Sequence, residues 1–312
     1  MTLEPTRADV LAAAERISGW IRHTPVETSR QLDERSGASV FLKCEQLQRT
    51  GAFKGRGATN AVQLLDEPAA ARGVACHSSG NHAGALAWAA SVRGIPCTIV
   101  MPSNASTAKS AAVAGYGAEI IWCEPTIAAR EQTLAEFLSS SGATEIHPYD
   151  HPDVIAGAGT AALELLAEVA DLDVIIAPVG GGGLLSGTIL AVDGAAEVLG
   201  AEPLGADDAQ RSVEAGSLIG DPDPVTIADG LRTPLSPRTF AIISAGVTRI
   251  ATVTDEEMIA AMRFCWERMK LVVEPSGVIG VALALRGELT GRRAGIIVSG
   301  GNLDLDALPW SQ

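Results

Sequence analysis

One lysine lies in an unusual sequence context. Residues 50–57, Thr-Gly-Ala-Phe-Lys-Gly-Arg-Gly, place Lys54 among three glycines just before a run that is typical of a helix. The chain has only four lysines in 312 residues, so lysine chemistry has few candidates. Glycines let a backbone approach a flat ligand closely. An amine that is desolvated by neighbouring residues loses proton affinity and becomes a nucleophile or a base. Lys54 is therefore a candidate Schiff-base lysine, with a solvated lysine on a turn as the alternative.

A polar loop, Ser78-Ser79-Gly80-Asn81-His82, follows a short apolar run and precedes a helical pattern over 83–90. Hydroxyl groups and free amide hydrogens at the start of a helix suit a carboxylate. The loop therefore predicts a carboxylate site. An ordinary serine N-cap is the alternative.

Two glycine-rich stretches also follow apolar runs. The first is a run of four glycines, Gly180, Gly181, Gly182 and Gly183. Consecutive free amide hydrogens are the arrangement that holds a phosphate dianion, and the spacing fits neither the dinucleotide fingerprint nor the P-loop. The second stretch is Ser299-Gly300-Gly301-Asn302, whose serine hydroxyl can exchange a hydrogen bond with a ring nitrogen but carries no charge. We predict a phosphate cradle at the first stretch, and the second alone indicates only a turn.

The elements that position these loops alternate along the chain. Short apolar runs separated by helical patterns cover residues 74–77, 98–101, 119–122, 174–178, 198–201 and 295–298. This alternation predicts an α/β fold with a parallel sheet and crossover helices. Ligands gather at the carboxyl ends of parallel strands, so we expect the loops to meet there.

Bulk properties describe an acidic globular protein. The chain is 47% hydrophobic and 19% charged, with a formal net charge of −14. Nucleic acids and anionic membrane surfaces prefer a basic face, so neither is an expected partner. Five widely spaced cysteines form no metal-binding pair and are expected to be buried thiols. The first five residues lack a signal-peptide pattern and no long apolar run occurs, which predicts a cytoplasmic protein.

Five motifs occur in the order typical of one known family. They cover residues 50–54, 78–82, 180–183, 274–277 (Glu-Pro-Ser-Gly) and 299–302. In this combination the chain resembles the serine/threonine dehydratase and serine racemase group of pyridoxal-phosphate-dependent enzymes, along essentially its whole length. The resemblance implies the two-lobed tryptophan-synthase-β-like fold (fold type II), with parallel sheets flanked by helices. It also implies a large cofactor-binding domain of residues 1–72 and 151–312, a small mobile domain of residues 73–150, and a homodimer.

The same resemblance assigns the cofactor site. Lys54 would carry the cofactor as a Schiff base and act as a base at the substrate Cα, and Phe53 would flank the pyridine ring. Asn81 would bind the ring 3-oxygen, Gly180 to Gly183 the phosphate, and Ser299 the ring nitrogen. Because a neutral hydroxyl does not enforce protonation of that nitrogen, elimination is favoured over a long-lived carbanion.

The substrate residues implied by the family are Ser78, Ser79, Asn81, His82 and Arg130. The loop over 78–82 would bind the α-carboxylate, and Ser79 would act as a second acid or base on the opposite face of Cα. Arg130 matches a family arginine that reaches the substrate side chain. Such a guanidinium could pair with a second carboxylate, which points to 3-hydroxyaspartate, although a helix-surface arginine is the alternative.

The implied reaction is an ammonia-lyase (dehydratase) reaction. Removal of the α-proton and loss of the β-hydroxyl as water from L-threonine or L-serine would give a 2-oxo acid and ammonia. Serine racemase activity and 3-hydroxyaspartate ammonia-lyase activity are the alternatives. A pyridoxal-phosphate or amino-acid binding protein without turnover is the alternative of another class.

An acidic loop, residues 202–208, resembles the divalent-metal loop of the same group. Glu202, the Ala206 carbonyl and Asp208 would be oxygen ligands suited to Mg²⁺ or Ca²⁺, with solvated surface acids as the alternative. Two positions depart from the family pattern: Ala52 replaces a serine and Ala158 replaces a glutamine. These departures leave the substrate preference open.

Overall fold

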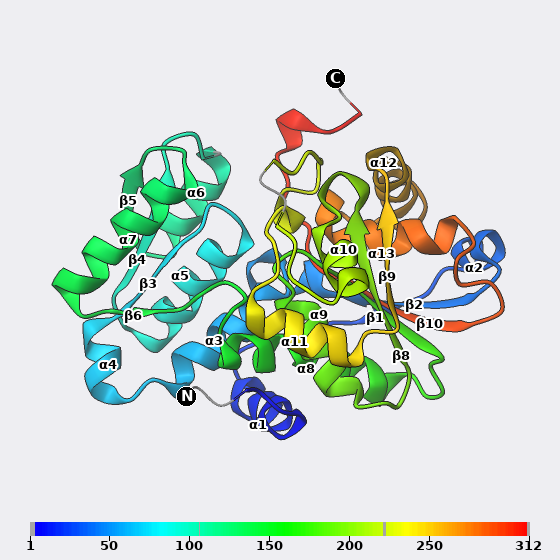
Figure 1. The fold of residues 1–312 in the computed structure, drawn as a ribbon, viewed down its shortest axis with the longest axis horizontal. Coiled ribbons are helices and arrows are strands. Elements are labelled where there is room, and N and C mark those ends of the chain that lie inside the picture. Colours follow the sequence, from blue (N-terminus) through cyan, green and yellow to red (C-terminus); the bar gives the residue numbers. More distant parts are fainter. Residues whose placement is uncertain (1–3, 106, 221–222, 311–312) are drawn as a thin grey trace.

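The structure is a computed structural model that describes residues 4–105, 107–220 and 223–310. Its strands form two sheets in two lobes, shown on the right and left of Figure 1. Residues 1–3 lie outside the described ranges. They belong to the five residues in which the sequence analysis found no signal-peptide pattern.

The larger sheet has six strands in the order β1-β2-β10-β7-β8-β9. All neighbouring pairs run parallel except β1 and β2, which are antiparallel. The strands are β1 (Val26–Glu27), β2 (Ser39–Cys44), β7 (Val174–Pro178), β8 (Glu197–Pro203), β9 (Arg249–Val253) and β10 (Arg293–Val298). The predicted runs at 174–178, 198–201 and 295–298 therefore belong to one sheet.

The smaller sheet has four parallel strands in the order β5-β4-β3-β6. They are β3 (Val74–His77), β4 (Cys97–Pro102), β5 (Glu119–Cys123) and β6 (Thr144–Glu145). The parallel α/β architecture predicted from the alternation is confirmed. The exact domain boundaries, and movement of the smaller domain, stay predictions.

Helices cover both sheets. Those of the larger lobe are α1 (Arg7–Ile17), α2 (Arg30–Ser36), α3 (Lys54–Leu64), α8 (Pro152–Glu168), α9 (Gly183–Val192), α10 (Asp208–Ala215), α11 (Pro237–Gly246), α12 (Asp255–Phe264) and α13 (Pro275–Leu285). Those of the smaller lobe are α4 (Glu67–Arg72), α5 (Asn81–Arg93), α6 (Thr107–Gly115) and α7 (Ile127–Ser141).

The central strand β7 is apolar on both faces. Val174 and Ile176 pack into the core cluster that contains α12 and α13, whereas Ile175 and Ala177 pack into the cluster that contains α8 and α9. Alternate residues of a strand point to opposite faces, so a continuous apolar run is what a strand covered on both sides requires. Each of the three buried valine and isoleucine side chains contributes about 1.5–3 kcal/mol.

The helices α8 and α9 approach each other closely through glycines. A Cβ atom at Gly187 would come within 2.4 Å of the Ile155 carbonyl oxygen and 2.6 Å of the Gly159 amide nitrogen. Any larger side chain would force the two helices apart. Their spacing sets the position of the loop at the start of α9.

Two simpler predictions have clear outcomes. All five cysteines are free, and four are buried while Cys123 is half-buried, so the prediction of buried thiols was wrong for Cys123. No helix within the described ranges is both long and apolar enough to cross a membrane.

Candidate active site

Lys54 is the first residue of α3. The preceding Phe53 amide donates a hydrogen bond to the Ser299 carbonyl oxygen (2.9 Å), which holds the start of α3 against the loop after β10. The Lys54 amine donates to the Pro148 carbonyl oxygen (2.8 Å) and lies 4.9 Å from the centre of the Phe53 ring. Loss of hydration lowers the pKa of this amine to about 8. Part of the amine is therefore unprotonated near neutral pH.

A chain of side-chain hydrogen bonds joins three segments that are far apart in sequence. Asn81, the first residue of α5, donates from Nδ2 to Glu274 Oε1 (2.7 Å). Its Oδ1 atom accepts from Asn302 Nδ2 (2.9 Å), which also donates to the Thr50 carbonyl oxygen (2.7 Å). The Asn81 side chain is thus held in one orientation beside the segment that leads to Lys54.

Glu274 belongs to one of the five motifs but received no role from the sequence. It is buried, and desolvation, together with the charge of Asp229, raises its pKa to about 8. A neutral carboxyl group here can donate as well as accept a hydrogen bond. An acidic residue inside the apolar run before Pro275 was the signal that could have indicated a buried, functional carboxyl.

The glycine loop leaves no space for side chains. A Cβ atom at Gly181 would lie 2.4 Å from a Tyr149 ring carbon, and Gly182 adopts a φ of +86° with Leu235 only 2.7 Å from its ideal Cβ position. Gly183 begins α9, and no side chain caps the amide hydrogens of its first turn. The loop therefore presents bare backbone amides at a helix start, as phosphate binding requires.

The polar loop after β3 places its serines in partly exposed positions. Ser78 and Ser79 are half-buried, and Ser78 Oγ accepts a hydrogen bond from the Gly80 amide (3.2 Å). His82 is buried, and its Nε2 atom lies 2.8 Å from the Ile146 carbonyl oxygen. Burial lowers the pKa of His82 to about 3, so the ring is neutral. His82 fastens this loop to the segment before Pro148, and its contact with substrate stays a prediction.

These features fit pyridoxal phosphate. The uncapped start of α9 suits its phosphate, and the lowered pKa of Lys54 suits an amine that must attack an aldehyde. Ser299 is buried, and within the described ranges its hydroxyl donates one long hydrogen bond, 3.4 Å, to the Ser276 carbonyl oxygen. A stronger acceptor can replace that carbonyl as the partner of the hydroxyl. The individual roles predicted for Phe53, Asn81, the four glycines and Ser299 stay predictions.

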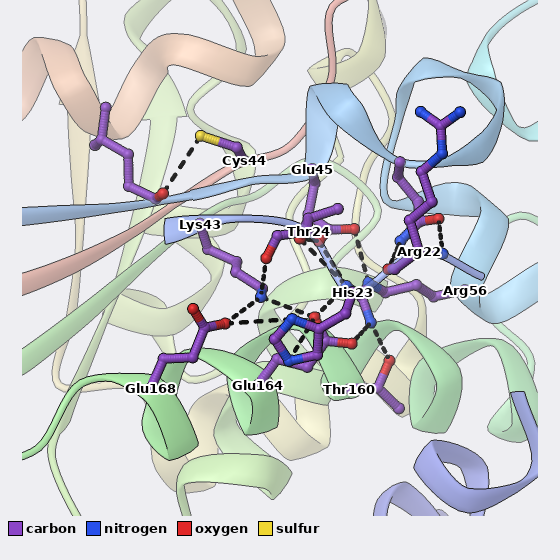
Figure 2. A network of polar contacts seen from close by, with 12 residues as sticks. Arg22, His23, Thr24, Lys43, Cys44, Glu45, Arg56, Thr160, Glu164 and Glu168 are labelled. Atoms are coloured by element: carbon purple, nitrogen blue, oxygen red, sulfur yellow. Dashed lines mark hydrogen bonds and ion pairs between the residues drawn. The ribbon is translucent and has the colours of Figure 1, made fainter. Parts of the chain in front are cut away.

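A buried ionic network contacts α3 on its rear side, which we define as the side facing β2 and α8 and opposite to the Lys54 amine (Figure 2). The Arg56 guanidinium donates to both Glu45 oxygens, at 2.7 Å each, and to both Glu164 oxygens, at 2.7 and 2.8 Å. Lys43 lies 2.8 Å from Glu164 and 3.0 Å from Glu168. The network ties the first turn of α3 to β2 and α8, and no sequence pattern indicated it.

Arg130, a residue of α7, lies near the end of β3. Burial lowers the pKa of His77, the last residue of β3; the charge of Glu131 opposes this shift, and the smaller influence of the Arg130 charge adds to it. The Nε atom of Arg130 is buried and has no hydrogen-bond partner among the residues that the structure describes. Arg130 is half-buried as a whole, and both its contact with the substrate and the alternative of a helix-surface arginine stay predictions.

The proposed metal ligands lie at the end of β8 and the start of α10. Glu202 is buried, and its carboxylate accepts hydrogen bonds from the amides of Ala209 (2.8 Å) and Gln210 (2.9 Å). Ala206 and Asp208 are buried beside it. Across the described ranges, no group of three or more His, Cys, Asp or Glu residues is placed to hold a metal ion. The arrangement explains Glu202 as a cap of α10 without a metal.

Comparison with known proteins defines the class. Residues 17–300 match the family model described as "Pyridoxal-phosphate dependent enzyme". The chain belongs to this family, and the fold type and the family predicted from the motifs are confirmed.

Particular relatives are similar along nearly the whole chain. The beta-hydroxyaspartate dehydratase of Paracoccus denitrificans is 49% identical, covering 98% of this chain and 99% of the relative. The L-threo-3-hydroxyaspartate ammonia-lyase of Saccharomyces cerevisiae is 48% identical, covering 96% and 94%. The structure of maize serine racemase superposes with a TM-score of 0.96 at 42% identity, covering 99% and 97%.

Proposed function

We propose that this protein is a pyridoxal-phosphate-dependent ammonia-lyase that converts 3-hydroxyaspartate to oxaloacetate and ammonia, with one water lost in the elimination and one taken up in the hydrolysis that follows. The single observation that carries the proposal is Arg130, a cation near the end of β3 whose buried Nε atom has no partner in the described part of the chain. A substrate with a second carboxylate would supply that partner. The names of two close relatives support the same substrate. This reverses the order given by the sequence, which placed L-threonine and L-serine first.

We assign substrate binding and proton transfer to different residues of the site. The amides and hydroxyls of the loop over 78–82 bind the α-carboxylate at the start of α5, where the helix dipole favours an anion. Lys54, with its pKa of about 8, takes the α-proton. Pyridoxal phosphate, when bound, supplies the electron sink for the negative charge left at Cα. Ser299 offers only a neutral hydroxyl to the ring nitrogen.

The elimination removes one molecule of water from the substrate. The Cα–H and Cβ–O bonds break, the α-proton goes to Lys54, and the hydroxyl leaves as water after receiving a proton. The released enamine hydrolyses to ammonia and a 2-oxo acid, which is oxaloacetate when the substrate is 3-hydroxyaspartate. Closure of the smaller domain over the site would exclude water during these steps.

A substrate panel tests the proposal. The holoenzyme is supplied with 3-hydroxyaspartate, L-serine and L-threonine, and the 2-oxo acid is measured. We expect kcat/KM for 3-hydroxyaspartate to exceed that for the other two by at least about tenfold, because the Arg130 charge is satisfied only by a second carboxylate. A preference for L-serine or L-threonine would overturn the substrate assignment. Cofactor absorbance without any 2-oxo acid would favour the binding protein.

Serine racemase activity is the second candidate, because Ser79 is half-buried in the loop where a second acid or base is expected. Ser79→Ala should reduce formation of D-serine from L-serine by at least about tenfold more than it reduces formation of pyruvate. Chiral chromatography with parallel pyruvate detection measures both products. An equal loss of both would count against the role of Ser79.

We include a divalent cation at Glu202, Ala206 and Asp208 in the proposal. Burial raises the pKa of Glu202 to about 8, and the charges of Asp208 and Asp207 add to this, a repulsion that a bound cation would relieve. Dialysis against a chelator should then lower the melting temperature, and Mg²⁺ or Ca²⁺ should restore it.

We also propose that the protein is a homodimer and that it is located in the cytoplasm. Analytical ultracentrifugation tests the dimer.

A further inference from the structure

Two histidines, His77 and His147, lie on neighbouring segments of the smaller lobe, one of which contacts Lys54. His77 is the last residue of β3, and His147 lies in the segment between β6 and α8. Next to His147 in sequence, the Pro148 carbonyl oxygen accepts the hydrogen bond of the Lys54 amine (2.8 Å). The charges of His77 and Lys54 both act on His147, and the Arg130 charge acts on His77. The Ile146 amide donates to the Ala75 carbonyl oxygen (3.0 Å) next to the parallel pairing of β3 and β6, so the chain brings His77 and His147 out of two neighbouring strands side by side.

The tautomer of His147 is set by its own backbone. Its Nδ1 atom accepts hydrogen bonds from the amides of Asp150 (2.9 Å) and Tyr149 (3.4 Å). The proton of the neutral ring must then be on Nε2, which becomes a donor. The Tyr149 ring packs edge-on against the imidazole, with centroids 4.6 Å apart and planes at 79°, and restricts its rotation. His147 is therefore a preoriented neutral donor.

The charges of this region suit one additional carboxylate. Burial keeps both imidazoles neutral, lowering the pKa of His147 to about 4 and that of His77 in the same direction. Arg130 is then the one fixed positive charge of the three. Glu131 and Asp150 act on the histidines with the opposite sign, but Glu131 is exposed and the Asp150 carboxylate pairs with Arg238.

We propose that His77 and His147 are specificity-determining residues that complete, with Arg130, a subsite for the second carboxylate of the substrate. Arg130 provides the charge, and the two imidazoles provide neutral N–H donors. This inference rests on the proposed function and names the residues that discriminate a dicarboxylic substrate from L-serine. A site built to hydrogen-bond a substrate group rejects analogues without it, because its own buried donors are then left unpaired.

Matched variants of the holoenzyme test the subsite. His147→Leu and His77→Leu remove the donor, whereas His147→Gln and His77→Gln keep an N–H donor at a reach close to that of Nε2. The exposed His23→Leu serves as the control. The kcat/KM ratio of 3-hydroxyaspartate to L-serine is measured for each variant whose cofactor absorbance and melting temperature stay close to those of the wild type. We expect the ratio to fall about tenfold or more in the leucine variants, and to stay within about threefold in the glutamine variants and the control.

A second readout does not depend on turnover. Succinate and butyrate have the same number of carbons, but only succinate carries a second carboxylate. In calorimetric titrations we expect His147→Leu to weaken succinate binding about tenfold, with a much smaller change for butyrate. Equal weakening of both ligands would reveal a merely structural role and would overturn the inference.

The two proposals can fail separately. If the wild type converts 3-hydroxyaspartate but the leucine variants keep both the kcat/KM ratio and the succinate affinity, the subsite is wrong and the proposed function stands. If the wild type does not convert 3-hydroxyaspartate yet binds succinate in a histidine-dependent way, the proposed reaction is wrong and the subsite stands.

Discussion

The first turn of α3 carries two cations, Lys54 and Arg56, in opposite surroundings. Behind the helix, Arg56 is fully buried and makes two bidentate pairs with Glu45 and Glu164 (Figure 2). In front of it, the Lys54 amine has one carbonyl partner and no carboxylate within salt-bridge distance in the described part of the chain. Two residues of the same turn thus show how a protein can keep a buried cation charged or make it lose its proton.

The consequences for protonation follow directly. Burial disfavours the charged form of Arg56, but the charges and hydrogen bonds of Glu45 and Glu164 outweigh it and raise the pKa of Arg56 above its usual value. For Lys54, desolvation dominates and the pKa falls to about 8. The ion pairs of Arg56 fix α3 in place, whereas Lys54, which has no ion pair, carries the reactive amine. Substitutions at single residues test this difference.

Removing the front cation has the largest expected effect. Lys54→Ala should lower turnover of any β-hydroxy amino acid by at least about a thousandfold, because the base at Cα is lost. The assay is formation of 2-oxo acid by protein incubated with the cofactor. The other three lysines provide controls, and Lys270→Ala, on an exposed turn, should keep near wild-type activity. Wild-type activity in Lys54→Ala would contradict the proposed mechanism.

Removing the rear cation, Arg56, should lower the free energy of unfolding. Arg56→Met leaves Glu45 and part of Glu164 buried without their partner, and we expect a loss of about 3–5 kcal/mol in the free energy of unfolding, measured with urea. Arg56→Lys keeps the charge but loses the bidentate geometry, so it should cost less. If the methionine variant were as stable as the lysine variant, the network would not be what fixes α3.

The pH dependence of cofactor binding sharpens the contrast. The free amine of Lys54 must attack the aldehyde, so the rate of reconstitution of the apoprotein should rise with pH and level off above about 8. Below that value it should fall about tenfold per pH unit, whereas an ordinary lysine would keep the rate rising to about pH 10.4. Stopped-flow absorbance measures the rate. A continued rise beyond pH 10 would show that Lys54 is solvated.

The smallest effect is expected at the edge of the network. Glu168 is partly exposed, and Lys43 retains Glu164 at 2.8 Å without it. Glu168→Gln should change the free energy of unfolding by less than about 1 kcal/mol, because partly exposed ion pairs contribute little. A loss comparable to that of Arg56→Met would mean that the network acts as one indivisible unit.

Much of this arrangement could be predicted from local sequence. The apolar runs gave the parallel strands, and the glycines around Lys54 and at 180–183 indicated the site, because periodicity and glycine content are local properties. Strand β9 (Arg249–Val253) was missed because polar residues interrupt it, and β1 and β6 because each has only two residues.

The remaining features depend on contacts between distant segments. Arg56 and Glu164 are separated by more than a hundred residues and their pairing leaves no local pattern. The same holds for the bond between Asn81 and Glu274, and for the approach of the Pro148 carbonyl to Lys54. His147 carried no signal, since its role depends on a backbone turn and on a lysine from another lobe.

The central claim is that Lys54, and no other lysine, holds the cofactor. The direct measurement is reduction of the holoenzyme with borohydride, followed by proteolysis and mass spectrometry of the lysine-containing peptides. We predict a reduced pyridoxyl group on Lys54 alone. An adduct on Lys43, Lys109 or Lys270 instead, or none in protein fully loaded with pyridoxal phosphate, would contradict the account.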